Sequence, residues 1–241
     1  MSKKLGIIGG MGPKATSIFF SNIINKTVAT NDREHLEMII LNDTKIPDRT
    51  AAIEGGEYQP LLNQLISDVR ILESLKVDNI AMPCNTSCFF IEELQSQTNI
   101  PIINMVEETA KHIANISEKQ NVTVGILATN GTIKSQLYTN ALQKYGIKCI
   151  EPDDVLQDHV MNLIYNQIKK NGHGNISDFN YVLDRMIKYG CNYVILGCTE
   201  LSYFNHNYFI SDYCIDALEV LTKVSIELSN KEYKKTLVLQ N

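Results

Sequence analysis

The chain has 241 residues, 44% of them hydrophobic and 20% charged, with a formal net charge of −5 and no basic stretch, so nucleic acid and anionic membranes are excluded as expected partners. No apolar run approaches the ~18 residues that a membrane span needs. Gly9, Gly10 and Gly12 break the short apolar run near the N-terminus, so no signal peptide is predicted and we expect a cytoplasmic protein.

Short apolar runs alternate with longer helical patterns along the chain. The runs that predict strands are Leu5–Gly9, Glu37–Leu41, Asn79–Met82, Val122–Ala128, Ile147–Ile150 and Tyr193–Leu196. They are continuous rather than alternating, which is typical of parallel strands covered on both faces. Helices are predicted near residues 14–29, 58–75, 88–97, 105–118, 133–144, 154–170, 177–189 and 216–229. The alternation predicts an α/β fold with parallel sheets flanked by helices.

An internal repeat divides this pattern into two halves. The run Leu5–Gly12 (LGIIGGMG) opens the first half and Val124–Gly131 (VGILATNG) opens the second. Later in each half, Asp78–Thr86 (DNIAMPCNT) resembles Cys191–Thr199 (CNYVILGCT), a strand followed by cysteine and threonine. A repeat on this scale predicts two similar lobes with pseudo-twofold symmetry and an active site in the cleft between them.

The lobe boundary is expected near Asn99-Ile100-Pro101, where the composition breaks the helical pattern. The last predicted helix, near Asp216–Leu228, is expected to return to the first lobe. The first lobe is therefore predicted to comprise residues 1–98 and 213–241, and the second residues 99–212.

Cys84 and Cys198 occupy matching positions in the repeat, after a strand in each half. Ligands bind beyond the carboxyl ends of parallel strands, so the two cysteines are expected to meet across one cleft. Inversion at carbon needs one base and one acid on opposite faces, and thiols, with a usual pKa of ~8.5, can serve in either role. Asn85, Thr86 and Thr199 offer hydrogen bonds nearby. The alternative interpretation is two buried structural cysteines.

Two further motifs bear on ligand chemistry. Gly10–Ala15 fits the dinucleotide fingerprint, but Pro13 and Lys14 fill positions where a pyrophosphate loop prefers small residues. Met11 lies in this loop and Thr129 in the equivalent loop of the second half, and a carboxylate bound at a helix N-terminus explains both copies. The cysteines form no CxxC pair and the histidines are not at ligand spacing, so no metal site is predicted.

Cationic side chains are the other candidates for binding. Arg49 follows the second predicted strand and could hold a carboxylate with two parallel hydrogen bonds; the alternative is an arginine on a polar surface loop. Lys169 and Lys170 end a predicted helix, where cations are ordinary. The sequence by itself leaves both alternatives open.

The chain resembles the aspartate/glutamate racemase family, and most closely its aspartate branch. The matching stretches are GIIGGMGP (6–13), NDTKIPDRT (42–50), AMPCNT (81–86), IYNQIK (164–169) and LGCTEL (196–201), in order over nearly the whole chain. The resemblance implies racemisation without a cofactor by two cysteines, on two α/β lobes, usually in a homodimer.

Carried over by motif, the resemblance implies specific roles for residues of this chain. The paired catalytic cysteines fall on Cys84 and Cys198, and the carboxylate-binding cations on Arg49 and Lys169. Contacts from the loops fall on Met11, Asn85 and Thr86. Thr129 and Thr199 are expected to assist because of their positions in the loops of the second half, not because of the resemblance. One departure is Cys88, which stands where many relatives carry a histidine, so the rate or the side-chain preference could differ here.

The sequence therefore predicts a racemase that interconverts L- and D-aspartate, or glutamate, with no cofactor and no metal. A small acidic amino acid is the expected substrate and a homodimer the expected assembly. Three alternatives stay open: a dinucleotide-dependent oxidoreductase, a decarboxylase or isomerase on the same fold, and an amino-acid-binding protein without turnover.

Overall fold

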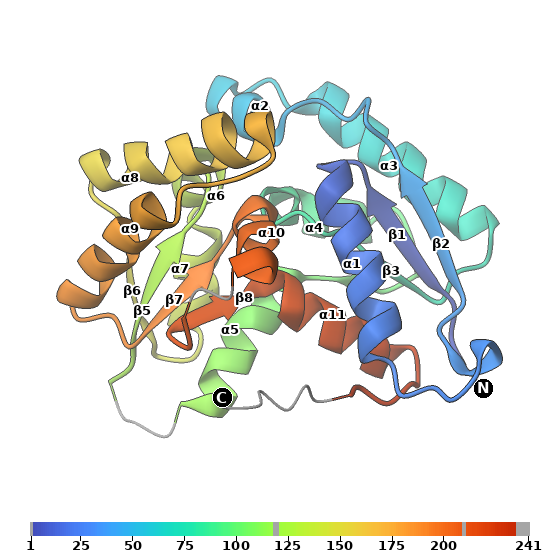
Figure 1. Cartoon of the computed structure of the whole chain (residues 1–241). Helices are drawn as coiled ribbons and strands as arrows, with labels where there is room; N and C mark the ends of the chain where they lie inside the picture. The colour runs from blue at the N-terminus through green and yellow to red at the C-terminus, as the bar shows by residue number, and fades with distance from the viewer. Residues whose placement is uncertain (1, 118–120, 209–210, 235–241) are drawn as a thin grey trace.

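The computed structural model describes residues 2–117, 121–208 and 211–234, which form two parallel four-stranded sheets (Figure 1). The strand order is β2-β1-β3-β4 in the first sheet and β6-β5-β7-β8 in the second, so the same arrangement occurs twice in chain order. Helices flank both sheets (Figure 1). The predicted fold class and its two similar lobes are confirmed.

In the sheet of the first lobe, β1 pairs with β2 on one side and with β3 on the other, and β4 lies at the edge next to β3. Its strands are β1 (Leu5–Gly9), β2 (Met38–Asn42), β3 (Asn79–Ala81) and β4 (Ile102–Ile103). Its helices are α1 (Pro13–Lys26), α2 (Arg49–Gly55), α3 (Gln59–Ser74), α4 (Ile91–Gln95) and α5 (Met105–Ile116), with 3₁₀ turns η1 (Asp32–Glu34) and η2 (Thr86–Phe90). Every residue of β1 is buried, which is why this strand reads as a continuous apolar run.

The second lobe repeats the pattern. Its strands are β5 (Thr123–Leu127), β6 (Lys148–Ile150), β7 (Tyr193–Leu196) and β8 (Cys214–Asp216). Its helices are α6 (Asn130–Lys134), α7 (Leu137–Gln143), α8 (Asp154–Met161), the π-helical η3 (Asn162–Lys169), α9 (Ile176–Lys188) and α10 (Thr199–Tyr208), followed by α11 (Ala217–Leu228). As expected from the sequence, α11 returns to pack on α1 and α5.

The predicted lobe boundaries need two corrections. Strand β4 pairs with β3, so the first sheet extends past residue 98. Strand β8 pairs with β7, so residues 214–216 belong to the second sheet although they fall in the range 213–241 assigned to the first lobe. Both are edge strands of two or three residues, too short for an apolar pattern to reveal them.

Two glycines allow the close approaches that shape the region between the sheets. Gly10, directly after β1, has φ +91°, and a Cβ there would lie 2.2 Å from the carbonyl oxygen of Asp43. In α6, a Cβ on Gly131 would lie 2.9 Å from the Cα of Thr50 in α2, across the lobe interface. Only a residue without a side chain permits either approach.

The hydrophobic core runs through both lobes. One cluster of buried side chains includes Leu5 and Phe19 of the first lobe together with Val124 and Tyr138 of the second. The lobes are therefore held together by continuous packing, and the site between them rests on a common core. In the described part of the chain, no helix is long and apolar enough to cross a membrane.

Candidate active site

A cavity lies between the lobes at the carboxyl ends of the central strands. Its lining residues are Met11, Asp48, Arg49, Thr50, Cys84, Asn85, Thr86, Thr129, Ile164, Tyr165, Lys169, Cys198, Thr199 and Glu200. Every catalytic and binding candidate from the sequence is in this set. The two cysteines come from opposite lobes, as the repeat predicts.

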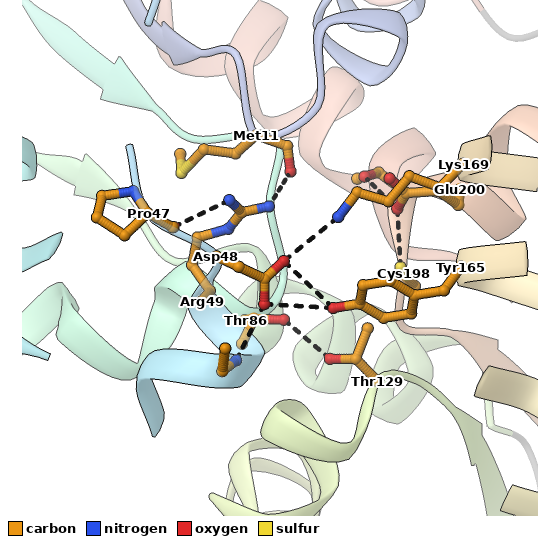
Figure 2. Close-up of polar contacts among 12 residues, drawn as sticks. Met11, Pro47, Asp48, Arg49, Thr86, Thr129, Tyr165, Lys169, Cys198 and Glu200 are labelled. Carbon is orange, nitrogen blue, oxygen red and sulfur yellow. Dashed lines mark hydrogen bonds and ion pairs between the residues drawn. The ribbon is translucent and has the colours of Figure 1, made fainter. Parts of the chain in front are cut away.

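Cys84 follows β3 on the first-lobe side of the cavity, close to Arg49. Arg49 opens α2, and its guanidinium donates hydrogen bonds to the carbonyl oxygens of Met11 (2.7 Å) and Pro47 (3.1 Å) (Figure 2). Burial alone would lower the pKa of Arg49, but attraction to Cys84, and then to Asp48, raises it. The guanidinium is thus fixed as a cation beside the Cys84 thiol.

Cys198 follows β7 on the opposite side, and its surroundings are different. Its side chain is 7% exposed, and its thiol donates a hydrogen bond to Glu200 Oε2 at 2.9 Å (Figure 2). Burial and the negative charge of Glu200 raise the pKa of Cys198 well above its usual value. One cysteine therefore faces a cation and the other a carboxylate.

An ion pair lies at the edge of the cavity. Lys169 Nζ lies 3.4 Å from Asp48 Oδ2 and 4.5 Å from the ring centroid of Tyr165, whose hydroxyl lies 3.4 Å from the same carboxylate (Figure 2). Burial raises the pKa of Asp48, but hydrogen bonding to the Ala51 amide and the charge of Lys169 outweigh it and lower that pKa. Both side chains of the ion pair are 37% exposed, so the pair contributes at most ~1 kcal/mol and can exchange partners.

Three threonine hydroxyls tie the lobes together at one wall of the cavity. Thr86 Oγ1 of the first lobe lies 3.1 Å from Thr129 Oγ1 and 2.9 Å from Thr132 Oγ1 of the second. The two second-lobe hydroxyls are 3.3 Å apart, so the three form a closed ring. Because all three are buried, this ring fixes the loops that carry Cys84 and the start of α6.

Among the buried polar atoms that lack a hydrogen-bond partner in the described part of the chain, two donors belong to residues that line the cavity: Arg49 Nε and Asn85 Nδ2. The amide oxygen of Asn85 accepts a hydrogen bond from the Tyr138 hydroxyl, which fixes the orientation of the amide. A buried unpaired donor costs about 1–3 kcal/mol, so these two atoms favour a ligand with acceptor oxygens. Both residues line the cavity, which suits a carboxylate.

Sequence reasoning missed Asp48, Tyr165 and Glu200 as site residues, although all three lie inside the motifs that it quoted. Asp48 could have been predicted as the N-cap of a helix, and its side chain does cap α2 by accepting a hydrogen bond from the Ala51 amide at 2.9 Å. Glu200 stands two residues after Cys198, and this spacing at the start of a helix could have drawn attention to it.

Cys88, the position that departs from many relatives, does not line the cavity. It packs behind Cys84, with its sulfur 3.9 Å from the Cys84 carbonyl oxygen, and burial raises its pKa to about 12. It is therefore held as a neutral thiol. Among the described residues, no cluster of histidine, cysteine and carboxylate side chains could hold a metal ion.

The first glycine loop also differs from a pyrophosphate cradle. It presents the Met11 carbonyl, an acceptor that Arg49 occupies, toward the cavity. A pyrophosphate needs donors at this position, so the geometry does not favour the dinucleotide interpretation.

Comparison with known proteins agrees with this geometry. Residues 8–222 match the Asp/Glu/Hydantoin racemase family. The "Broad specificity amino-acid racemase RacX" of Bacillus subtilis is 30% identical over 203 residues, which is 82% of this chain and 86% of that protein. A solved structure titled "Picrophilus torridus aspartate racemase" is 32% identical, with a TM-score of 0.80 over 97% of this chain and 96% of that one.

More distant structures share the fold. The structure of glutamate racemase from Francisella tularensis, in complex with D-glutamate, has a TM-score of 0.64 and 19% identity, covering 94% of this chain and 81% of that one. The family match spans both lobes and both cysteine loops. The chain is a racemase that belongs to the Asp/Glu/Hydantoin racemase family.

Proposed function

We propose that this protein interconverts L- and D-aspartate by proton transfer between Cys84, Cys198 and the α-carbon of the substrate. The observation that carries the proposal is the cavity itself, in which thiols from opposite lobes meet unpaired carboxylate-binding donors. Racemisation at carbon needs an acid and a base on opposite faces of one bound substrate, and this cavity offers both.

The binding step is assigned to Arg49 and Asn85. Their unpaired atoms, Nε and Nδ2, would bind one carboxylate of the substrate and so remove the cost of two buried unsatisfied donors. The same cation would stabilise negative charge that builds up as the α-proton leaves, so part of its effect belongs to the transition state.

The second carboxylate is assigned to Lys169. Its present partner is Asp48, at 3.4 Å, and this half-exposed pair is weak enough for a substrate carboxylate to compete. Asp48 would then be free to bind the substrate ammonium group. Two cationic side chains in one small cavity favour a short acidic amino acid, with aspartate preferred over glutamate.

The chemical step exchanges protons only. A thiolate on one face removes the α-proton, breaking the C–H bond and forming S–H, and the thiol on the other face donates its proton to the resulting carbanion. No electron acceptor enters this balance, so we propose that the reaction needs neither pyridoxal phosphate, nicotinamide nor metal. We further propose a cytoplasmic homodimer, on the basis of the family resemblance.

Exchange of the α-hydrogen in deuterated water tests the proposal directly. The dialysed protein, treated with a chelator, is incubated with L-aspartate, L-glutamate, L-alanine and L-lysine and followed by proton NMR and chiral chromatography. We expect loss of the α-proton signal and formation of D-aspartate without any added cofactor.

Other outcomes would favour the alternatives. Release of carbon dioxide would indicate a decarboxylase, and activity restored only by a nicotinamide would indicate an oxidoreductase. Binding of aspartate with no exchange at all would indicate an amino-acid-binding protein, and would contradict the proposed function.

A further inference from the structure

We infer that Glu200 is a positioning residue for Cys198 and shares a single proton with it, so that the two halves of the pseudo-symmetric site rest in different protonation states. The inference rests on the proposed function, because it assigns opposite starting roles to the two cysteines. In the resting enzyme, the Cys198 sulfur holds the proton that it shares with Glu200, whereas the charge beside Cys84 is the Arg49 guanidinium.

The geometry around Cys198 is that of a proton held between two atoms. The Cys198 sulfur and Glu200 Oε2 are 2.9 Å apart, and the cysteine is buried. The Thr199 hydroxyl lies 3.4 Å from the same oxygen. Glu200 stands in the first turn of the ten-residue helix α10, where the helix dipole stabilises a carboxylate. The carboxylate is therefore held as the acceptor and the sulfur as the donor.

The internal repeat shows where this asymmetry arises. Both copies keep the cysteine and a threonine, but Cys84 is followed by Asn85-Thr86 whereas Cys198 is followed by Thr199-Glu200. The amide of Asn85 is neutral, and Cys84 interacts with the Arg49 guanidinium, which is also attracted to Asp48 and Glu200. One thiolate would thus form beside a cation and the other beside an anion.

Electrostatics supports the same assignment. Two negative charges 2.9 Å apart beside a buried sulfur repel each other. Burial and this repulsion together raise the pKa of Cys198. When the Cys198 sulfur loses its proton, either this sulfur or the Glu200 carboxylate therefore takes up another proton.

The proton balance of a full cycle follows from this arrangement. The Cys84 thiolate takes the α-proton of the substrate and becomes a thiol, and Cys198 donates its S–H proton to the opposite face and becomes a thiolate. The product enzyme then carries the thiolate beside Glu200. The pair takes a proton from water, which Glu200 passes to the Cys198 sulfur, while Cys84 returns its proton to water, and the resting state is restored.

Site-resolved alkylation tests the pairing without a substrate. The full chain is treated with iodoacetamide at a series of pH values between about 6 and 10, and peptides with Cys84 and Cys198 are quantified by mass spectrometry. In wild type we expect Cys84 to react faster than Cys198 near neutral pH. In Glu200→Gln we expect Cys198 to react about tenfold faster at the same pH, because the repulsion is gone.

The control is Glu57→Gln, which removes one exposed carboxylate from the loop between α2 and α3 and should leave both cysteine profiles unchanged. If Glu200→Gln does not fold, as judged by circular dichroism, Glu200→Asp withdraws the carboxylate by one methylene and should also speed alkylation of Cys198. A folded variant with an unchanged Cys198 profile would overturn the inference.

A second experiment compares the steady-state kinetics of L-aspartate with those of D-aspartate. The equilibrium constant between L- and D-aspartate is one, so kcat/KM is equal in the two directions, but kcat and KM need not be. Glu200→Gln should change kcat for one enantiomer more than for the other, because one direction starts from the Cys198 thiol. If the wild-type protein exchanges no α-proton of aspartate, the proposed function is refuted. The alkylation profiles of Cys198 would still show whether Cys198 and Glu200 share a proton.

Discussion

Replacement of Arg49 by lysine separates charge from geometry at the centre of the cavity. Lysine keeps the positive charge but cannot form the two hydrogen bonds to Met11 and Pro47 at 2.7 and 3.1 Å, and it has no atom in place of the unpaired Nε. Each structural hydrogen bond contributes about 1 kcal/mol net, so the free energy of unfolding should fall by ~1–2 kcal/mol.

The effect of this substitution on catalysis should be larger. A hydrogen bond to a charged group contributes ~1.5–3 kcal/mol, which corresponds to a loss of about 10- to 150-fold in kcat/KM for aspartate. Part of the loss should be in kcat, because Arg49 also faces the Cys84 thiol and the developing carbanion.

The assay compares wild type, Arg49→Lys and Arg33→Lys. Arg33 lies in the exposed turn η1, so its replacement should leave kcat/KM and unfolding unchanged. Initial rates are followed by chiral chromatography and stability by urea denaturation. If Arg49→Lys racemises aspartate at the wild-type rate, a positive charge alone suffices, and the assignment of Nε to a substrate carboxylate is wrong.

Three further predictions follow from the site and its supports. Cys84→Ser and Cys198→Ser should each lower the racemisation rate by ~10²–10⁴ with an unchanged circular dichroism spectrum, and a wild-type rate in either variant would contradict the two-thiol mechanism. Lys169→Ala should raise KM for aspartate while leaving slow turnover of alanine unaffected, and equal effects on both substrates in steady-state kinetics would remove Lys169 from carboxylate binding. Gly10→Ala should lower the free energy of unfolding by ~2–4 kcal/mol in urea because its Cβ would meet a carbonyl oxygen at 2.2 Å, whereas Gly55→Ala, with nothing within 4 Å, serves as the control and should change stability by less than ~1 kcal/mol.

The sequence by itself determined the lobes and the pairing of the cysteines. Buried parallel strands are continuous apolar runs, so the two runs that open the two halves could be recognised without any knowledge of contacts. The repeat then placed Cys84 and Cys198 at equivalent strand ends, because equivalent positions of a duplicated fold meet across its symmetry axis. Arg49 and Lys169 entered through motifs, and both line the cavity.

Tertiary structure decided what the sequence left open. Strands β4 and β8 exist only because each completes an existing sheet edge, since two or three residues carry no periodic signal of their own. Short helix α2 likewise depends on its Asp48 cap and on the close approach of Gly131 to Thr50 from the other lobe.

The unlike environments of the two cysteines are also a tertiary property. A sequence repeat predicts equivalent backbones, but the charge beside Cys84 comes from a distant part of the chain, and the contact of Glu200 with Cys198 depends on how α10 begins. Arg49 reaches Cys84 from α2, 35 residues earlier, whereas Glu200 bonds to Cys198 from the adjoining turn of α10. Electrostatic interactions depend on distance in space and on burial, and only the folded chain fixes both.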